Sequence, residues 1–298
     1  RLDDHDRRIM LIAAIAGGFG AVFGVPIAGA VFALEVQAIG RVRYDAIVPC
    51  LTASTIGAWV VHALGVHHTV VPRLAHYDLT LGLVARIAAA GLVFGLVGIF
   101  FIELTHGLKR VFRALVPWMP GRPVVGGVIV VLLTLAVGAQ TYNGLSLGLI
   151  HASLFGGDVS GWSWLLKLVF TAITLGALFQ GGEVTPLFVI GATLGAVLAV
   201  PLGVPVVLLA AIGFVAVFAG ATNTPIACTI MGLELFGGGG AVYFAIACVV
   251  AFVFSSHRGI YAAQRVAVDE RGRHVGDVAL RHWRRGRRSG SAGSSPAS

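Results

Sequence analysis

Long apolar runs, separated by short polar or Pro/Gly breaks, make up most of this chain. A helix needs about 20 apolar residues to cross a bilayer, so several of these runs are too short to span alone. In lipid, a broken helix persists only where protein buries the break or where it lines an aqueous cavity. The pattern therefore predicts an all-α, polytopic membrane protein of broken and tilted helices. The runs fall at roughly 9–39, 46–64, 82–105, 124–150, 162–180, 185–200, 203–219, 224–236 and 241–256.

Composition supports the membrane interpretation. Of the 298 residues, 57% are hydrophobic and 11% are charged, with a mean hydropathy of +0.91. Soluble globular domains carry about 25% charged residues. From Val184 to His257 the only carboxylate is Glu234, and neither Lys nor Arg occurs. These values exclude a soluble globular domain.

The basic residues lie at the ends of apolar runs, as the positive-inside rule predicts for short cytoplasmic loops. We therefore attribute the net charge of +8 to the cytoplasmic loops of a multi-pass protein of the plasma membrane or bacterial inner membrane. We expect no nucleic-acid partner. The Arg-rich and Ser/Gly-rich residues 266–298 are predicted to form a basic, disordered cytoplasmic tail. The other basic clusters are Arg7 with Arg8, Arg41 with Arg43, and Lys109 with Arg110 and Arg113.

Cysteine and histidine patterns give no sign of a metal site or a cofactor. Cys50, Cys228 and Cys248 lie in apolar runs without paired spacing, which is typical of small packing residues. Residues 65–81 are predicted to form an extramembrane loop. Its three histidines are irregularly spaced, so we expect no bound metal: His67, His68 and His76.

An internal repeat is the strongest signal within the chain. Pro-Ile-Ala occurs at 26–28 and at 225–227, and each copy is followed at the same distance by Leu-Glu, ending at Glu35 and Glu234. Internal duplication is typical of secondary transporters. A Gly-Phe-x-Ala-Val-Phe run precedes both copies, at 18–23 and 213–218.

Two further points concern the repeat: the role of its glutamates and the position of the first copy in the chain. For Glu35 and Glu234, a structural role, as a cap or as a partner of Arg41 or Arg43, competes with a role in transport. The second copy is also preceded by a Gly-rich break at 181–186, whereas too few residues precede the first copy to hold its counterpart. We therefore expect the chain to begin inside the first repeat.

The break at 181–186 is the principal candidate for a binding site. Thr185 suits an N-cap and Pro186 suits the first turn, so a helix is predicted to begin here. Its free N–H groups and positive dipole end would attract an anion, and Gly181 and Gly182 would let the backbone approach it closely. The alternative is that Glu183 only compensates the helix dipole.

Two side chains could take part in transport. Glu183 is an acid between two membrane segments, and intramembrane acids commonly relay protons. Burial would raise its pKa and favour proton exchange near neutral pH, unless it lies at an exposed mouth of the protein. Tyr261 follows the last apolar run, and it is either an interfacial anchor or a hydroxyl donor to a permeating anion.

Three of these motifs resemble the CLC family of anion channels and transporters. Residues 18–35 resemble the signature helix of its first repeat, 181–186 resemble its Gly-Gly-Ile-Phe-Ala-Pro element, and 213–234 resemble a later dimer-interface helix. The resemblance covers residues 7–265. It implies a homodimer with one pore per subunit, built from two inverted repeats of which the first is incomplete here.

The resemblance also implies a site and a branch of the family. The anion would be held by the backbone N–H groups of Glu183 and Val184 and by the hydroxyl of Tyr261. Glu-Val-Thr at 183–185 resembles the fluoride/proton antiporter branch, in which this glutamate and Thr185 line the ion path. Chloride/proton exchangers carry an internal glutamate where this chain has Val36, and the family's external gating glutamate has no match here.

We therefore expect antiport of fluoride, or of chloride, against protons, with Glu183 on the proton pathway. A passive chloride channel is the alternative within the family. A membrane enzyme or structural subunit is the rival from another class, but the sequence shows no catalytic constellation. The expected divisions are the end of the first repeat at 1–64, the loop at 65–81, the second repeat at 82–265 with a filter segment at 181–191, and the tail at 266–298.

Overall fold

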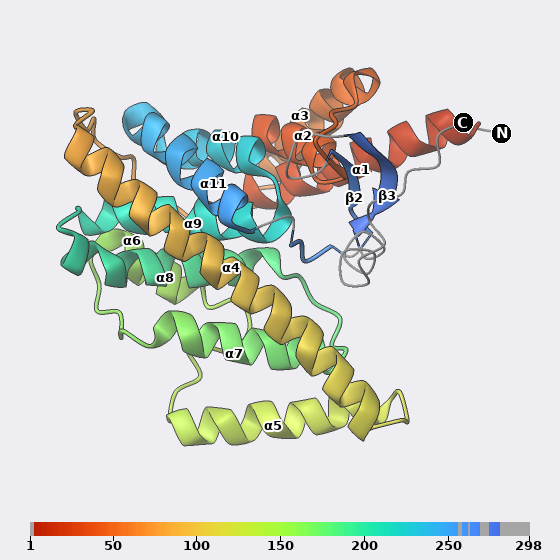
Figure 1. Cartoon of the computed structure of the whole chain (residues 1–298), viewed down its shortest axis with the longest axis vertical. Helices are drawn as coiled ribbons and strands as arrows, with labels where there is room; N and C mark the ends of the chain where they lie inside the picture. Colours follow the sequence, from red (N-terminus) through yellow and green to blue (C-terminus); the bar gives the residue numbers. More distant parts are fainter. Residues whose placement is uncertain (1–2, 256–257, 262, 269–273, 281–298) are drawn as a thin grey trace.

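The computed structural model describes residues 3–255, 258–261, 263–268 and 274–280. The predicted all-α architecture is confirmed, because eleven α-helices account for most of these residues (Figure 1). The helices are α1 (Asp4–Phe23), α2 (Pro26–Glu35), α3 (Ile47–Ala63), α4 (Leu81–Leu115), α5 (Gly121–Val137), α6 (Leu147–Phe155), α7 (Ser163–Gly176), α8 (Val184–Leu202), α9 (Val206–Thr222), α10 (Pro225–Phe236) and α11 (Ala241–Ser255).

Helix lengths agree with a membrane protein of broken spans. Four segments of the described chain are long and apolar enough to cross a bilayer: Tyr44–Ala63, Leu81–Leu115, Val184–Leu202 and Gly238–Ser255. Other apolar helices are shorter, such as α2 with 10 residues and α10 with 12. The longest, α4, runs diagonally across the molecule in Figure 1 and extends ten residues beyond the apolar run that predicts it.

The two Pro-Ile-Ala sequences mark equivalent helix breaks. Gly24 ends α1 with a left-handed φ of 68°, and α2 begins at Pro26. Asn223 ends α9 with a φ of 59°, and α10 begins at Pro225. Proline suits the first helical turn because its missing N–H would have no partner within the helix there. The apolar run at 9–39 is therefore two helices joined by a tight turn.

Helix α9 lies at the centre of the fold and is buried from Leu208 to Thr222. It packs against α8 backbone to backbone, because a Cβ on Gly191 would overlap the carbonyl oxygen of Gly213, and the reverse also holds. Glycines commonly allow such close contact between membrane helices. In Figure 1, α1–α3 lie at one end of the molecule and α5 at the other.

Aromatic rings join the two repeated runs at the centre of the molecule. Phe218 of the second run stacks on Phe19 of the first at 6.1 Å between ring centroids, and on Phe32 at 5.6 Å. Phe188 on α8 meets Phe218 edge to face at 5.1 Å. Phe188 also meets Phe23 of the first run edge to face at 5.3 Å, so the amino-terminal part of α8 is held against both copies of the repeat.

Residues 66–80 form a non-helical segment that lies against the helices. The Leu74 N–H donates to the Phe236 carbonyl oxygen at 2.8 Å, and the Tyr243 hydroxyl donates to the Asp78 carbonyl oxygen at 2.6 Å. A ring nitrogen of His68 lies 2.8 Å from the Ala21 carbonyl oxygen. Among the described residues, no group of three or more His, Cys, Asp or Glu is placed to hold a metal ion.

A small sheet follows the helices, with strand order β1 (Ala38–Ile39), β2 (Arg265–Val268) and β3 (His274–Ala279). The prediction of a disordered tail from residue 266 is wrong for the strand residues, because β2 pairs with β1 in parallel and with β3 in antiparallel. The backbone of β1 thus pairs with a strand from the carboxyl-terminal part of the chain. Residues 269–273 and 281–298 lie outside the described residues.

Candidate anion site

Helix α8 begins with Glu183 as its N-cap residue, followed by Val184, Thr185 and Pro186 as the first three helical positions. The prediction that Thr185 is the N-cap is wrong by two residues, whereas Pro186 does lie in the first turn. Proline is tolerated at this third position because the N–H there has no intrahelical partner. The first amide that finds a helical carbonyl is that of Leu187, which donates to Glu183 at 3.1 Å.

The first amides of α8 are left for another acceptor. Among the described residues no side chain caps this helix end, and Val184 and Thr185 are only half-buried. Helix geometry directs their N–H groups along the axis, where the partial positive charge of the helix dipole adds to their attraction for an anion. Upstream, Gly181 and Gly182 are exposed and bring no side chain in front of the helix end.

The starts of α2 and α10 differ from that of α8. The Glu234 carboxylate accepts hydrogen bonds from the N–H groups of Ile27 at 2.9 Å and Ala28 at 2.7 Å. The Glu35 carboxylate accepts from Ile226 at 3.1 Å and Ala227 at 2.8 Å. The capping role considered for these two glutamates is therefore correct.

The alternative pairing of Glu35 and Glu234 with Arg41 or Arg43 is wrong, because both carboxylates bind backbone amides. Arg43 binds Asp45 through two hydrogen bonds, of which the Nε–Oδ1 bond measures 3.1 Å. Both partners lie in the short connection after β1. The hydrogen bonds with Asp45 hold the pKa of the Arg43 guanidinium above its ordinary value, so it stays charged.

Tyr261 lies in the segment that follows α11 and is half-buried against the main core. Burial raises the pKa of its phenol, and the charge and hydrogen bonding of the Glu183 carboxylate raise it further. The phenol is therefore a neutral O–H donor at physiological pH. The same interaction shows that Tyr261 reaches the start of α8, so the structure brings two of the predicted site residues together.

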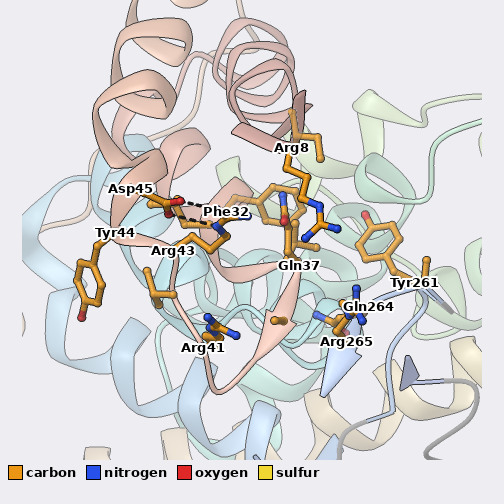
Figure 2. Close-up of a pocket in the computed structure, with 16 residues that line it drawn as sticks. Arg8, Phe32, Gln37, Arg41, Arg43, Tyr44, Asp45, Tyr261, Gln264 and Arg265 are labelled. Carbon is orange, nitrogen blue, oxygen red and sulfur yellow. Dashed lines mark hydrogen bonds and ion pairs between the residues drawn. The ribbon is translucent and has the colours of Figure 1, made fainter. Parts of the chain in front are cut away.

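A cavity of about 1010 Å³ opens beside Tyr261 (Figure 2). Phe32, Val36 and Gln37 contribute to its wall, so the position expected for an internal glutamate is occupied by an apolar side chain. A cavity rimmed with cationic side chains raises the local concentration of anions. Four arginines line it together with Asp45, which is paired with Arg43, so positive charge predominates: Arg8, Arg41, Arg43 and Arg265.

The sequence analysis missed two residues near Tyr261. Asn223 and Gln264 are almost fully buried, and their side-chain amides are hydrogen-bonded to each other at 2.9 Å. An asparagine that follows an apolar run and precedes Thr-Pro is a recognisable signal for a left-handed helix end. No sequence signal links Gln264 to it across 41 residues.

Comparison with known proteins identifies the family. Residues 1–256 match the protein family described as voltage gated chloride channel. The chain belongs to the CLC family. This assignment agrees with the resemblance carried by residues 18–35, 181–186 and 213–234.

Among curated CLC relatives, the chain is 47% identical to the "Chloride/fluoride channel protein" of Pseudomonas syringae pv. tomato, over 89% of this chain and 60% of that protein. It is 29% identical to the "Voltage-gated ClC-type chloride channel ClcB" of Shigella flexneri, over 87% of this chain and 65% of that protein. The chain thus spans less than two thirds of the length of these relatives.

Solved CLC structures match the fold. A crystal structure of a CLC-type fluoride/proton antiporter superposes with a TM-score of 0.84 at 36% identity, covering 87% of this chain and 65% of the other. A slow cyanobacterial Cl⁻/H⁺ antiporter superposes with a TM-score of 0.67 at 17% identity, covering 85% and 62% of the two chains. The second match concerns the fold alone.

Proposed function

We propose that the full-length protein exchanges fluoride, or failing that chloride, for protons across the membrane. The observation that carries this proposal is the meeting of Glu183 and Tyr261 at the start of α8, where the described residues leave the first amides uncapped. The names of the Pseudomonas relative and of the fluoride/proton antiporter structure support the choice of ion.

The anion would be held by hydrogen-bond donors alone. The backbone N–H groups of Glu183 and Val184, together with the hydroxyls of Thr185 and Tyr261, replace part of its water shell. A full cationic side chain in a low-dielectric site would hold the ion too tightly for rapid release. The arginine-rimmed cavity supplies anions to the site from one side without placing a cation against them.

Glu183 would couple the anion to the proton. A carboxylate at the start of α8 competes with an anion for the same amides and repels it. Once protonated, the carboxyl group is neutral and offers an O–H donor to the anion. Exchange follows when the carboxyl group takes up its proton from the side toward which the anion leaves, because each released anion is then matched by a proton moving in the opposite direction.

The remaining parts of the proposal concern the whole protein. It is a transporter and not an enzyme, it works as a homodimer, and it lies in the plasma membrane or bacterial inner membrane. Residues 1–64 and 82–265 belong to the two CLC repeats, residues 181–191 form the filter segment, and residues 65–81 lie outside the membrane.

Efflux from liposomes tests the proposed function. The full-length protein is reconstituted into vesicles loaded with fluoride or chloride, and ion-selective electrodes record the release of each ion. We expect faster fluoride release, accompanied by proton uptake that continues against a proton gradient. Equal release of both ions would contradict the choice of fluoride, and release without proton movement would favour the passive channel.

A further inference from the structure

A buried polar network lies beneath the Tyr261 segment, at the carboxyl end of α9. Its members are nearly inaccessible to solvent: Thr222 and Ser255 are 0% exposed, Asn223 is 2% exposed and Gln264 is 3% exposed. Polar side chains are costly to bury unless each one is hydrogen-bonded. Four such side chains in one place therefore require a specific arrangement.

The hydrogen bonds of this network form a chain in which each group donates to the next, from Ser255 to the Thr222 backbone. The Ser255 hydroxyl lies 3.4 Å from Oδ1 of Asn223 as donor, and Nδ2 of Asn223 donates to Oε1 of Gln264 at 2.9 Å. Nε2 of Gln264 then donates to the carbonyl oxygen of Thr222 at 2.9 Å. Both ends of each amide are used, so neither side chain can flip without losing bonds.

The Tyr261 segment rests on this network. The N–H of Ile260 donates to the Ala221 carbonyl oxygen at 2.9 Å, next to the end of α9. A Cβ on Gly259 would lie 2.8 Å from Nδ2 of Asn223 and 2.8 Å from Oε1 of Gln264. The backbone on the amino side of Tyr261 is therefore pressed against the amide pair.

The carboxyl side of Tyr261 is held by Gln264 itself. The Gln264 N–H donates to the Tyr261 carbonyl oxygen at 3.0 Å, and its own carbonyl oxygen accepts from the Leu280 N–H at 2.7 Å. One residue later, the Arg265 N–H donates to the Gln37 carbonyl oxygen at 2.9 Å, where β2 joins β1. Gln264 thus connects the tyrosine segment to α9 by its side chain and to the sheet by its backbone.

We propose that the Asn223–Gln264 amide pair is a positioning device that sets where the Tyr261 hydroxyl lies relative to the start of α8. This inference rests on the proposed function, because it assigns the pair a task only if Tyr261 serves the anion. Neither amide touches the anion in this scheme. Asn223 also supplies the left-handed turn that ends α9, so a glycine or asparagine is needed there in any case.

Substitution of Gln264 tests the device while leaving the turn at Asn223 intact. Gln264→Met keeps the side-chain length but loses both hydrogen bonds, whereas Gln264→Glu keeps an acceptor for Asn223 and loses the donor to Thr222. Since a displacement of about 1 Å can lower a rate by about 100-fold, we expect fluoride efflux to fall about tenfold or more in both variants.

A double-mutant cycle separates positioning from general destabilisation. Gln264→Met is combined with Tyr261→Phe, and efflux is measured for the four proteins. If the pair acts through the Tyr261 hydroxyl, Gln264→Met should lower efflux less than about twofold in the Tyr261→Phe background. An equal fold-loss in both backgrounds would overturn the inference.

Ser153→Ala is the matched control, because it removes a fully buried polar group on α6, and it should transport normally.

Hydrogen exchange distinguishes failure of this inference from failure of the proposed function. In Gln264→Met, the Ile260 and Gln264 amides should exchange faster than in the unaltered protein, while amides of α6 do not change. Unchanged exchange at these two amides would overturn the inference. Faster exchange together with unimpaired efflux in Tyr261→Phe would retain the anchoring role and reject the function proposed for Tyr261.

Discussion

Glu35 and Glu234 cap each other's helices. Glu35 ends α2 and binds two N–H groups at the start of α10, and Glu234, near the end of α10, binds two N–H groups at the start of α2. The two helices therefore lie antiparallel, with a carboxylate at each junction. In sequence these residues are the last of each repeat unit, so the exchange follows directly from the inverted duplication. Each carboxylate occupies a helix end that would otherwise attract an anion.

Removal of one cap should destabilise the protein. Glu35→Ala leaves the exposed Ile226 amide and the part-buried Ala227 amide without their acceptor, and loss of such a helix cap costs about 0.5–2 kcal/mol. We expect a lower unfolding temperature in detergent, with unfolding measured by tryptophan fluorescence. Glu35→Gln, which retains one acceptor oxygen, should lie between Glu35→Ala and the unaltered protein.

The control for this prediction is Asp158→Ala, which removes a carboxylate from an exposed loop position. Its unfolding temperature should not change, since exposed charges away from caps and networks contribute little to stability. A Glu35→Ala protein as stable as the Asp158→Ala protein would contradict the capping role.

Close contact between α8 and α9 gives a second prediction. In Gly191→Ala the new methyl group would overlap the Gly213 carbonyl oxygen, so the helices must separate. Overpacking of this kind costs about 1–3 kcal/mol, and it should also shift the start of α8 and impair transport. Gly107→Ala on α4 is the matched control, because its Cβ would meet no neighbour within 4 Å.

In this experiment both variants are compared by thermal unfolding and by fluoride efflux. Gly107→Ala should be as stable as the unaltered protein or slightly more stable, because alanine favours a helix over glycine. Equal stability of the two variants would show that the α8–α9 contact tolerates a side chain.

Much of this architecture could be predicted from the sequence. Apolar runs identified the membrane class, and the repeated Pro-Ile-Ala revealed a duplication whose two copies each begin a helix in the structure. The start of α8 was predicted within two residues, since Pro186 fits any position of the first turn. These features depend on local chemistry, which a single stretch of sequence contains.

Contacts between distant segments could not be predicted in the same way. The sequence left open whether Glu35 would meet Arg41, Arg43 or a helix end, because that choice depends on how α2 and α10 pack. The Asn223–Gln264 pair joins residues 41 apart. The strand pairing of Arg265–Val268 depends on β1, more than 200 residues earlier, so it had no local signal.

Lys167 is a further residue whose role only the structure shows. It is 1% exposed, and its ammonium donates to the carbonyl oxygens of Tyr142 at 3.2 Å and Gly144 at 2.6 Å and to the Ser146 hydroxyl at 2.8 Å. Lys167→Met should leave these acceptors unpaired and release the loop between α5 and α6. Limited proteolysis should then cut at residues 138–146, whereas Lys109→Met, at an exposed position on α4, should leave the loop resistant.

Tyr261→Phe should give a loss of transport that does not depend on pH. Burial and the Glu183 carboxylate raise the pKa of the phenol, so the hydroxyl remains protonated and able to donate from acidic to mildly alkaline pH. Loss of one hydrogen bond to a charged ion costs about 1.5–3 kcal/mol, or roughly 10- to 150-fold in apparent affinity. Fluoride dependence of efflux at pH 5.5 and pH 8 checks this. A fold-loss present only at the lower pH would mean that the phenol ionises.

Fluoride-driven proton uptake in Glu183→Gln tests the central claim most directly. The full-length protein and the variant are reconstituted in liposomes, and an outward fluoride gradient is applied while external pH is recorded. Glutamine keeps the size of the side chain but cannot exchange a proton, so proton uptake should be abolished even if residual fluoride leakage persists. Proton uptake at an unchanged ratio to fluoride in Glu183→Gln would contradict the assignment of Glu183 and of the α8 start as the exchange site.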